Sequence, residues 1–126
     1  MKPLKLLIFS SPLLLAAMVA GIPVASAHSF PQEETPSAGQ RLSAPPAEIT
    51  IKFDAPIEKV FAKLEVLGAD GKPETIGSPE VGSSALTLSV KVAALKPGDY
   101  TVKWGVVCID SHHTEGSYVF TVTGGG

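Results

Sequence analysis

Histidine is scarce in this chain, and its three copies lie in two places. His28 lies near the N-terminus, and His112 and His113 stand side by side in the segment CIDSHHTEG, residues 108–116. Asp110 precedes His112 by two positions. Imidazole nitrogens and carboxylate oxygens are ligands of divalent transition metals. These residues therefore form a candidate metal-binding set, although a surface loop with two incidental histidines explains the tandem pair about equally well.

The first 27 residues have the organisation of a secretory signal peptide. Two lysines supply a positive start, residues 6–20 are apolar, and Ala25-Ser26-Ala27 has the small-x-small pattern that signal peptidase accepts. The apolar stretch is shorter than the ~20 residues that span a bilayer, which argues against a membrane anchor. We expect cleavage after Ala27, which would leave a mature chain of residues 28–126 without a membrane span.

Cleavage would give His28 a free α-amino group. This amine and the imidazole Nδ1 of the same residue can close a six-membered chelate ring on one metal ion. The amine titrates near ~7.7 to 8, far below lysine, so a metal ion displaces its proton easily near neutral pH. A histidine at an internal position has no such amine, so the predicted cleavage position itself points to a metal site.

The second cluster complements this chelate. On an extended backbone, residues two apart face the same side, which places Asp110 and His112 together with Cα atoms ~6.6 Å apart. Ser111 and His113 then face away, and His113 is expected to face solvent or to support a ligand. With His28, the cluster supplies an amine nitrogen, two imidazole nitrogens and one carboxylate oxygen.

Three nitrogens and one oxygen suit a square-planar or tetragonal ion, and copper(II) heads the divalent affinity order. Nickel(II) is the nearest competitor, and zinc(II) fits the ligand types but prefers tetrahedral geometry. Copper(I) prefers soft sulfur ligands. Both methionines lie in the predicted signal peptide, and Cys108 is the only cysteine. We expect one copper(II) ion per chain, held by His28, Asp110 and His112.

Cys108 allows two interpretations. In strict alternation it shares a face with Trp104 and Asp110, which would place it below the metal site, but a small buried apolar residue is the favoured interpretation. As the only cysteine, it cannot form an intramolecular disulfide. Glu33 and Glu34 are expected to be solvated, although both lie close enough in sequence to the first histidine to orient it.

The predicted mature chain of 99 residues is long enough for one domain with a modest core. It has eight basic and twelve acidic residues, a net charge of −4. This balance argues against nucleic acid as a partner.

Hydrophobic alternation predicts an all-β fold. Segments with the period of two that is typical of half-buried strands are 48–53, 62–67, 85–92, 100–107 and 117–122. Turn signals lie at ADGK, residues 69–72, and at KPGD, residues 96–99. Residues 28–46 are expected to be mostly irregular, with one short strand at most, and residues 55–64 to form a loop. Short strands joined by turns indicate a small antiparallel β-sandwich or barrel.

Two long segments carry a family resemblance. They are TPSAGQRLSAPPAEITIKFDAPI, residues 35–57, and LKPGDYTVKWGVVCIDSHHTEGSYVFTV, residues 95–122. Together with a histidine directly after a signal peptide, they resemble the CopC family of periplasmic copper-binding, copper resistance proteins. The most specific pieces are the TP-x-x-G opening, the P-G-x-Y-x-V-x-W strand, and D-x-H followed by Gly116. The resemblance covers essentially the whole predicted mature chain.

The resemblance implies a Greek-key β-sandwich of the Ig-like or cupredoxin-like kind, a periplasmic location, and copper(II) bound by His28, Asp110 and His112. It also implies a membrane copper importer as a possible partner, and a monomer is expected. The chain departs from the family pattern at Ser29, where alanine is frequent, and at Cys108, where serine is common. It also has Ser-His-His at 111–113 in place of Gly-His-Pro, which leaves a further protein ligand open.

Three function classes compete. The leading hypothesis is a non-catalytic copper(II) carrier or buffer that acts in copper homeostasis. A copper monooxygenase with an N-terminal histidine brace, as in lytic polysaccharide monooxygenases, is disfavoured because the chain is short and has few aromatic side chains. Asp110 as a ligand would also occupy a planar position that oxygen chemistry needs. A metal-free Ig-like module is the third possibility, and it predicts no metal affinity.

Overall fold

Eight β-strands and no helix occur in the described part of the chain, Pro3 and residues 29–124, in a computed structural model of the protein. The strands are β1 (Pro31–Thr35), β2 (Arg41–Leu42), β3 (Glu48–Phe53), β4 (Lys63–Leu67), β5 (Thr75–Val81), β6 (Thr87–Val92), β7 (Gly98–Val107) and β8 (His113–Val122). Within this part of the chain, nothing forms a helix long and apolar enough to cross a membrane. Apart from Pro3, the predicted signal peptide lies outside the described residues, and so does His28.

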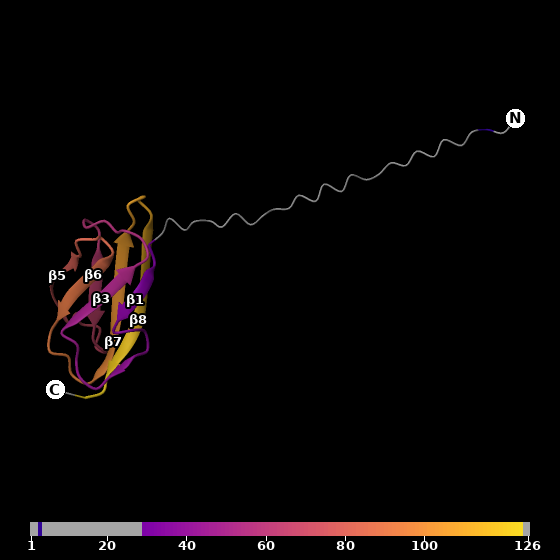
Figure 1. The fold of residues 1–126 in the computed structure, drawn as a ribbon. Coiled ribbons are helices and arrows are strands. Elements are labelled where there is room, and N and C mark those ends of the chain that lie inside the picture. Colours follow the sequence, from indigo (N-terminus) through magenta and orange to yellow (C-terminus); the bar gives the residue numbers. More distant parts are fainter. Residues whose placement is uncertain (1–2, 4–28, 125–126) are drawn as a thin grey trace.

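The strands form two four-stranded sheets that face each other as a sandwich (Figure 1). One sheet has the order β1-β3-β6-β5, and the other has the order β2-β8-β7-β4. All pairings are antiparallel except that of β2, whose two residues pair in parallel with β8. The predicted all-β sandwich is therefore confirmed.

Strict alternation builds the core between the sheets. In β3, Ile49, Ile51 and Phe53 are buried, whereas Glu48 and Lys52 face solvent. The inward side chains of the other central strands are Leu88, Val90, Val92, Tyr100, Val102, Trp104, Val106, Tyr118, Phe120 and Val122. Burial of such side chains stabilises a fold by roughly 1.5–3 kcal/mol each. The period of two that predicted the central strands is thus the pattern that orients them.

The edge strands are where the sequence-based expectation is incomplete. Strand β5 is not among the predicted strands, and Gly77 and Pro79 interrupt its alternation. The strand tolerates both residues because it lies at a sheet edge, where its pairing with β6 is irregular between Ile76 and Glu80 and Gly77 has a φ of 72°. The segment expected to be mostly irregular contains two short strands, β1 and β2.

A buried hydroxyl group near β1 gives a stability prediction. The Tyr118 hydroxyl has no hydrogen-bond partner among the described residues, and burial and the nearby Glu34 carboxylate raise the pKa of Tyr118 above its usual value. An unsatisfied buried polar group costs about 1–3 kcal/mol. We therefore expect Tyr118→Phe to raise the free energy of unfolding by about 1 kcal/mol in urea denaturation of the metal-free protein.

The matched control is Tyr100→Phe. The Tyr100 hydroxyl donates a hydrogen bond to the Lys96 carbonyl oxygen at 2.6 Å, so its removal should lower the free energy of unfolding by about 1 kcal/mol. Equal losses in both variants would contradict the assignment of Tyr118 as an unsatisfied donor.

Candidate metal centre

The connection between β7 and β8 is a tight turn that carries both predicted protein ligands of the C-terminal cluster. The Ser111 N–H donates to the Cys108 carbonyl oxygen at 2.9 Å, and the Cys108 N–H donates to the His112 carbonyl oxygen at 2.8 Å. Ser111 has a φ of 73°, a left-handed conformation that is uncommon outside glycine. The expectation of an extended backbone through Asp110 and His112 is therefore wrong, because the chain reverses here to join two hairpin strands.

The turn nevertheless brings the two side chains together by another route. The His112 N–H donates to Asp110 Oδ1 at 3.2 Å, which is the local bond that short polar side chains make in turns. His112 Nδ1 lies 3.1 Å from Asp110 Oδ2. The side chains are 58% and 31% exposed, respectively, so solutes reach both.

The separation of 3.1 Å suits metal binding as well as hydrogen bonding. Two metal–ligand bonds of about 2.0–2.2 Å at a right angle place their donor atoms about 3 Å apart. Without a metal ion, the same distance allows an Nδ1–H group to donate to the carboxylate, and a carboxylate on one ring nitrogen also orients the other nitrogen toward an ion. Asp110 can therefore act as a direct ligand beside His112 or fix its ring.

His28 lies outside the described residues, so its predicted place in the set stays a prediction. Within the described residues, no group of three or more histidine, cysteine, aspartate or glutamate side chains is placed to hold a metal ion. The structure thus brings together Asp110 and His112 and leaves the third predicted ligand untested.

Two neighbours of this pair have clear positions. His113 is exposed at the start of β8, and a Cβ atom placed on Gly105 would lie 3.5 Å from its Nε2, so its ring covers the outer surface of the sheet. The expectation that His113 faces solvent is confirmed. Cys108 is buried, with an exposed fraction of 1%, which fits both interpretations of this residue.

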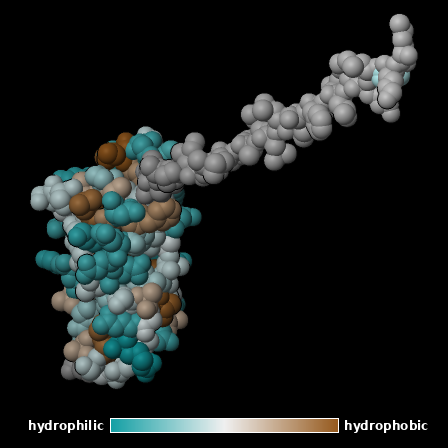
Figure 2. Space-filling view, turned by 45° about the vertical axis from the view of Figure 1, so that its right-hand side comes forward, coloured by the Kyte–Doolittle hydropathy of each residue, from teal (hydrophilic) through white to brown (hydrophobic). Residues whose placement is uncertain are grey.

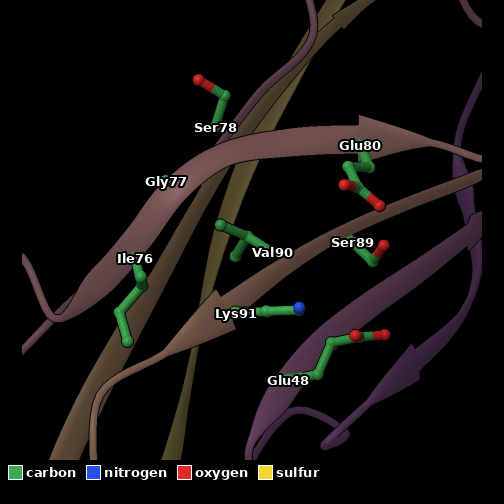
Figure 3. Close-up of a pocket in the computed structure, with 8 residues that line it drawn as sticks. All are labelled: Glu48, Ile76, Gly77, Ser78, Glu80, Ser89, Val90 and Lys91. Carbon is green, nitrogen blue, oxygen red and sulfur yellow. The ribbon is translucent and has the colours of Figure 1, made fainter.

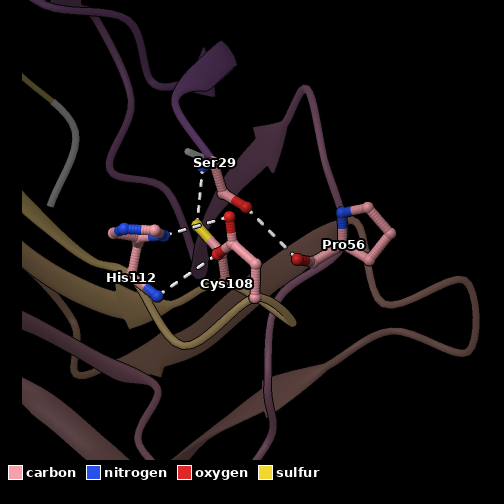
Figure 4. A network of polar contacts seen from close by, with 5 residues as sticks. Ser29, Pro56, Cys108 and His112 are labelled. Atoms are coloured by element: carbon pink, nitrogen blue, oxygen red, sulfur yellow. Dashed lines mark hydrogen bonds and ion pairs between the residues drawn. The ribbon is translucent and has the colours of Figure 1, made fainter. Parts of the chain in front are cut away.

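Ser29 is the residue whose role the sequence patterns did not reveal. It is fully buried, and its N–H donates to Cys108 Sγ (Figure 4). Its hydroxyl donates to the carbonyl oxygens of Ala55 and Pro56 at 3.0 and 3.2 Å. Its own carbonyl oxygen accepts a hydrogen bond from Thr114 Oγ1 at 2.8 Å. The residue next in sequence to His28 is therefore fixed against the hairpin that carries Asp110 and His112.

Apolar side chains surround this end of the sandwich. Phe30, Val60, Phe61 and Ile109 are all between 47% and 79% exposed. The segment that contains Val60 and Phe61 is joined to the hairpin by a hydrogen bond from the Glu58 N–H to the Val107 carbonyl oxygen. Figure 2 shows apolar surface at the corresponding upper end of the molecule. The polar pair thus lies near exposed apolar groups.

A separate hollow lies over β3, β5 and β6, and Figure 3 shows its lining. Its charged side chains are Glu48, Glu80 and Lys91, and its lining includes neither histidine nor cysteine. This donor set does not match a transition-metal site. The β7–β8 turn therefore remains the candidate metal centre.

A β-sandwich with an accessible histidine–aspartate pair on a hairpin turn at one end is the class of protein that these observations define. The CopC domain family matches residues 32–123, which is most of the chain. The protein belongs to the CopC family.

Individual relatives agree with this assignment. Protein YobA of Escherichia coli strain K12 is 34% identical over 98 residues, which cover 76% of this chain and 79% of YobA. Copper transport protein CutJ of Bacillus subtilis is 26% identical over 98 residues, which cover 76% of this chain and 18% of CutJ. The crystal structure of CopC from Methylosinus trichosporium OB3b superposes with a TM-score of 0.72 at 28% identity, covering 77% of this chain and 95% of that protein.

Proposed function

We propose that this protein is a periplasmic copper(II)-binding protein that acts as a carrier or buffer in copper homeostasis and resistance, without catalysis. It would bind one copper(II) ion through the amine and imidazole of His28, the Asp110 carboxylate and the His112 imidazole. The observation that carries the proposal is the Asp110–His112 pair, whose donor atoms lie 3.1 Å apart on an accessible turn. Membership of the CopC family supports copper as the cargo.

The anchoring of Ser29 supports the third ligand. Consecutive Cα atoms lie ~3.8 Å apart across a trans peptide bond. Anchoring Ser29 therefore limits how far the α-amine of residue 28 can lie from the turn. Ser29 is bonded to Cys108, two residues before Asp110. Export and cleavage after Ala27 would place the free amine of the mature chain at this end of the domain.

The match to copper transport protein CutJ supports a membrane copper importer as the proposed partner. CutJ matches this chain over only 18% of its own length, so a domain of this kind occurs there as part of a larger copper transport protein. We propose that the present chain exchanges copper with a separate membrane importer. Binding by Asp110 also favours a carrier over a monooxygenase, because a fourth planar ligand leaves no planar position for oxygen.

The experiment that tests this function is a copper(II) titration of residues 28–126, with the N-terminus verified by mass, against a competing chromophoric chelator. We expect one ion per chain and an electron paramagnetic resonance spectrum typical of three nitrogens and one oxygen. His112→Gln should weaken copper(II) binding by about a hundredfold, since loss of even an outer-shell partner costs 10–100-fold.

His113→Gln is the matched control, because the adjacent histidine covers the outer surface of the sheet. Its copper(II) affinity should stay within about twofold of the wild type. Equal losses in the two variants, or no tight binding by the wild-type protein, would refute the proposed function.

A further inference from the structure

We propose that Cys108 is a positioning residue for copper, whose Sγ fixes the start of the mature chain against the Asp110–His112 turn before the ion arrives. This inference rests on the function proposed above and adds a residue to it. Cys108 is not assigned as a ligand. Its role is to accept the N–H of Ser29, the residue that follows the proposed N-terminal ligand.

Hydrogen bonds from outside the β-sheet ladders satisfy all the polar groups of Ser29. Strand β1 begins only at Pro31, so the ladder with β3 does not fix Ser29. Its N–H, carbonyl oxygen and hydroxyl each have a partner, and the residue is fully buried. A backbone donor buried in this way is costly to leave unpaired. The sulfur of Cys108 is the acceptor that satisfies it.

Cys108 links the two parts of the proposed site. Its N–H and carbonyl oxygen close the turn through His112 and Ser111, at 2.8 and 2.9 Å. Its sulfur accepts the Ser29 N–H, as Figure 4 shows. The other backbone anchor of Ser29 is Thr114, which lies just beyond the turn on β8. Both anchors therefore come from the hairpin that carries the predicted ligands, so this hairpin fixes Ser29, the residue that follows the proposed N-terminal ligand.

Such anchoring affects affinity because chain ends are poorly ordered unless they are tied down. A mobile terminus would lose conformational freedom when it binds the ion, and that loss weakens binding. If folding has already ordered the terminus, an ion bound to Asp110 and His112 meets the N-terminal chelate at a high effective concentration. Removal of the acceptor at Cys108 should therefore weaken copper(II) binding without removing a ligand.

The test compares Cys108→Ala, which lacks an acceptor, with Cys108→Ser, whose hydroxyl retains one. In the chain that begins at His28, we expect Cys108→Ala to weaken copper(II) binding about tenfold, the lower end of outer-shell losses. Cys108→Ser should restore affinity to within about threefold of the wild type. Unchanged affinity in Cys108→Ala, with tight binding by the wild type, would overturn the proposal.

A second arm separates positioning of the terminus from general support of the fold. Cys108→Ala is also made in a chain that retains Ala25-Ser26-Ala27 before His28 and so lacks the amine chelate. There the substitution should change copper(II) affinity by less than about twofold, because the α-amine is no longer a donor and the opened chelate no longer depends on a fixed chain start. An equal tenfold loss in both chains would show that Cys108 acts only on the turn or the fold, which contradicts the proposal.

A third measurement needs no metal. The Ser29 amide hydrogen should exchange with solvent more slowly in the wild type than in Cys108→Ala, at matched global stability. Equal exchange rates would overturn the proposed anchor. A wild-type protein that protects this amide but binds copper(II) weakly would instead refute the proposed function, so the two failures are distinguishable.

Discussion

A chain that keeps Ala25-Ser26-Ala27 in front of His28 is expected to bind copper(II) about a thousandfold more weakly than the chain that begins at His28. The extension turns the α-amine of His28 into an amide, which removes one donor and opens the chelate ring. A thousandfold loss corresponds to about 4 kcal/mol. Competition titrations of the two chains at the same pH measure it directly.

The length of the extension matters for this experiment. A single added residue would create a new local chelate, in which its own amine, the following amide and the His28 imidazole bind one copper(II) ion together. That ion would not need Asp110 and His112. Three added residues place the new amine too far away for that small ring system. The metal-free forms of both chains should unfold at the same urea concentration. Equal copper(II) affinity of the two chains would exclude the amine as a ligand.

The second large effect is expected for Gly116→Ala, which should lower the free energy of unfolding by about 3 kcal/mol. Gly116 lies opposite Trp104 in the pairing of β7 with β8. A Cβ atom at Gly116 would lie only 2.7 Å from Cζ2 of the Trp104 ring and 2.9 Å from Cε2. Trp104 is 8% exposed, and its ring packs edge-on against the Phe53 ring with 5.4 Å between the ring centroids. The ring therefore has little room to move. Overpacking of this kind typically costs 1–3 kcal/mol or more.

Gly105→Ala is the matched control for this substitution. Gly105 lies on the same hairpin, one residue after Trp104, and the nearest atom to an added Cβ is His113 Nε2 at 3.5 Å. This is an ordinary contact, so the free energy of unfolding should change by less than about 0.5 kcal/mol. Urea denaturation of the metal-free proteins measures both variants. A similar, small effect for both would show that the Trp104 ring can move aside.

Gly116 also shows how a motif that carried the family resemblance gains a physical explanation. The sequence presents only a glycine four residues after His112, with no sign of what it contacts. In the structure, the Trp104 indole ring of the neighbouring strand occupies the space that a side chain at Gly116 would need. A cross-strand contact of this kind depends on register, which the sequence pattern of one strand does not specify.

The central strands were predictable because burial between two sheets enforces alternation, as in Ile49, Ile51 and Phe53. Asp110 and His112 lie side by side as their spacing predicted, but not on an extended backbone. The positive φ of Ser111 and the local hydrogen bond from the His112 N–H to Asp110 Oδ1 replace the extended backbone that the spacing suggested. A turn with a left-handed serine leaves no periodic signature.

Ser29 was not predictable for a different reason. Its partners Cys108 and Thr114 lie 79 and 85 residues away in sequence, and Ala55 lies 26 residues away. Only the folded arrangement of loop, hairpin and N-terminus joins them. The sequence shows a small polar residue after a histidine, whereas the structure shows a fully bonded, buried anchor.

The burial of Ser29 also sets an order of events in time. A peptidase that cuts before residue 28 must hold the residues on both sides of the bond in its own cleft, and in the folded domain Ser29 is 0% exposed. The proposed cut therefore has to come before this end of the domain folds. In that order, folding buries Ser29 after the cut and completes the proposed copper site. A precursor that folded before processing would shield the proposed cleavage site and could not form the proposed amine chelate.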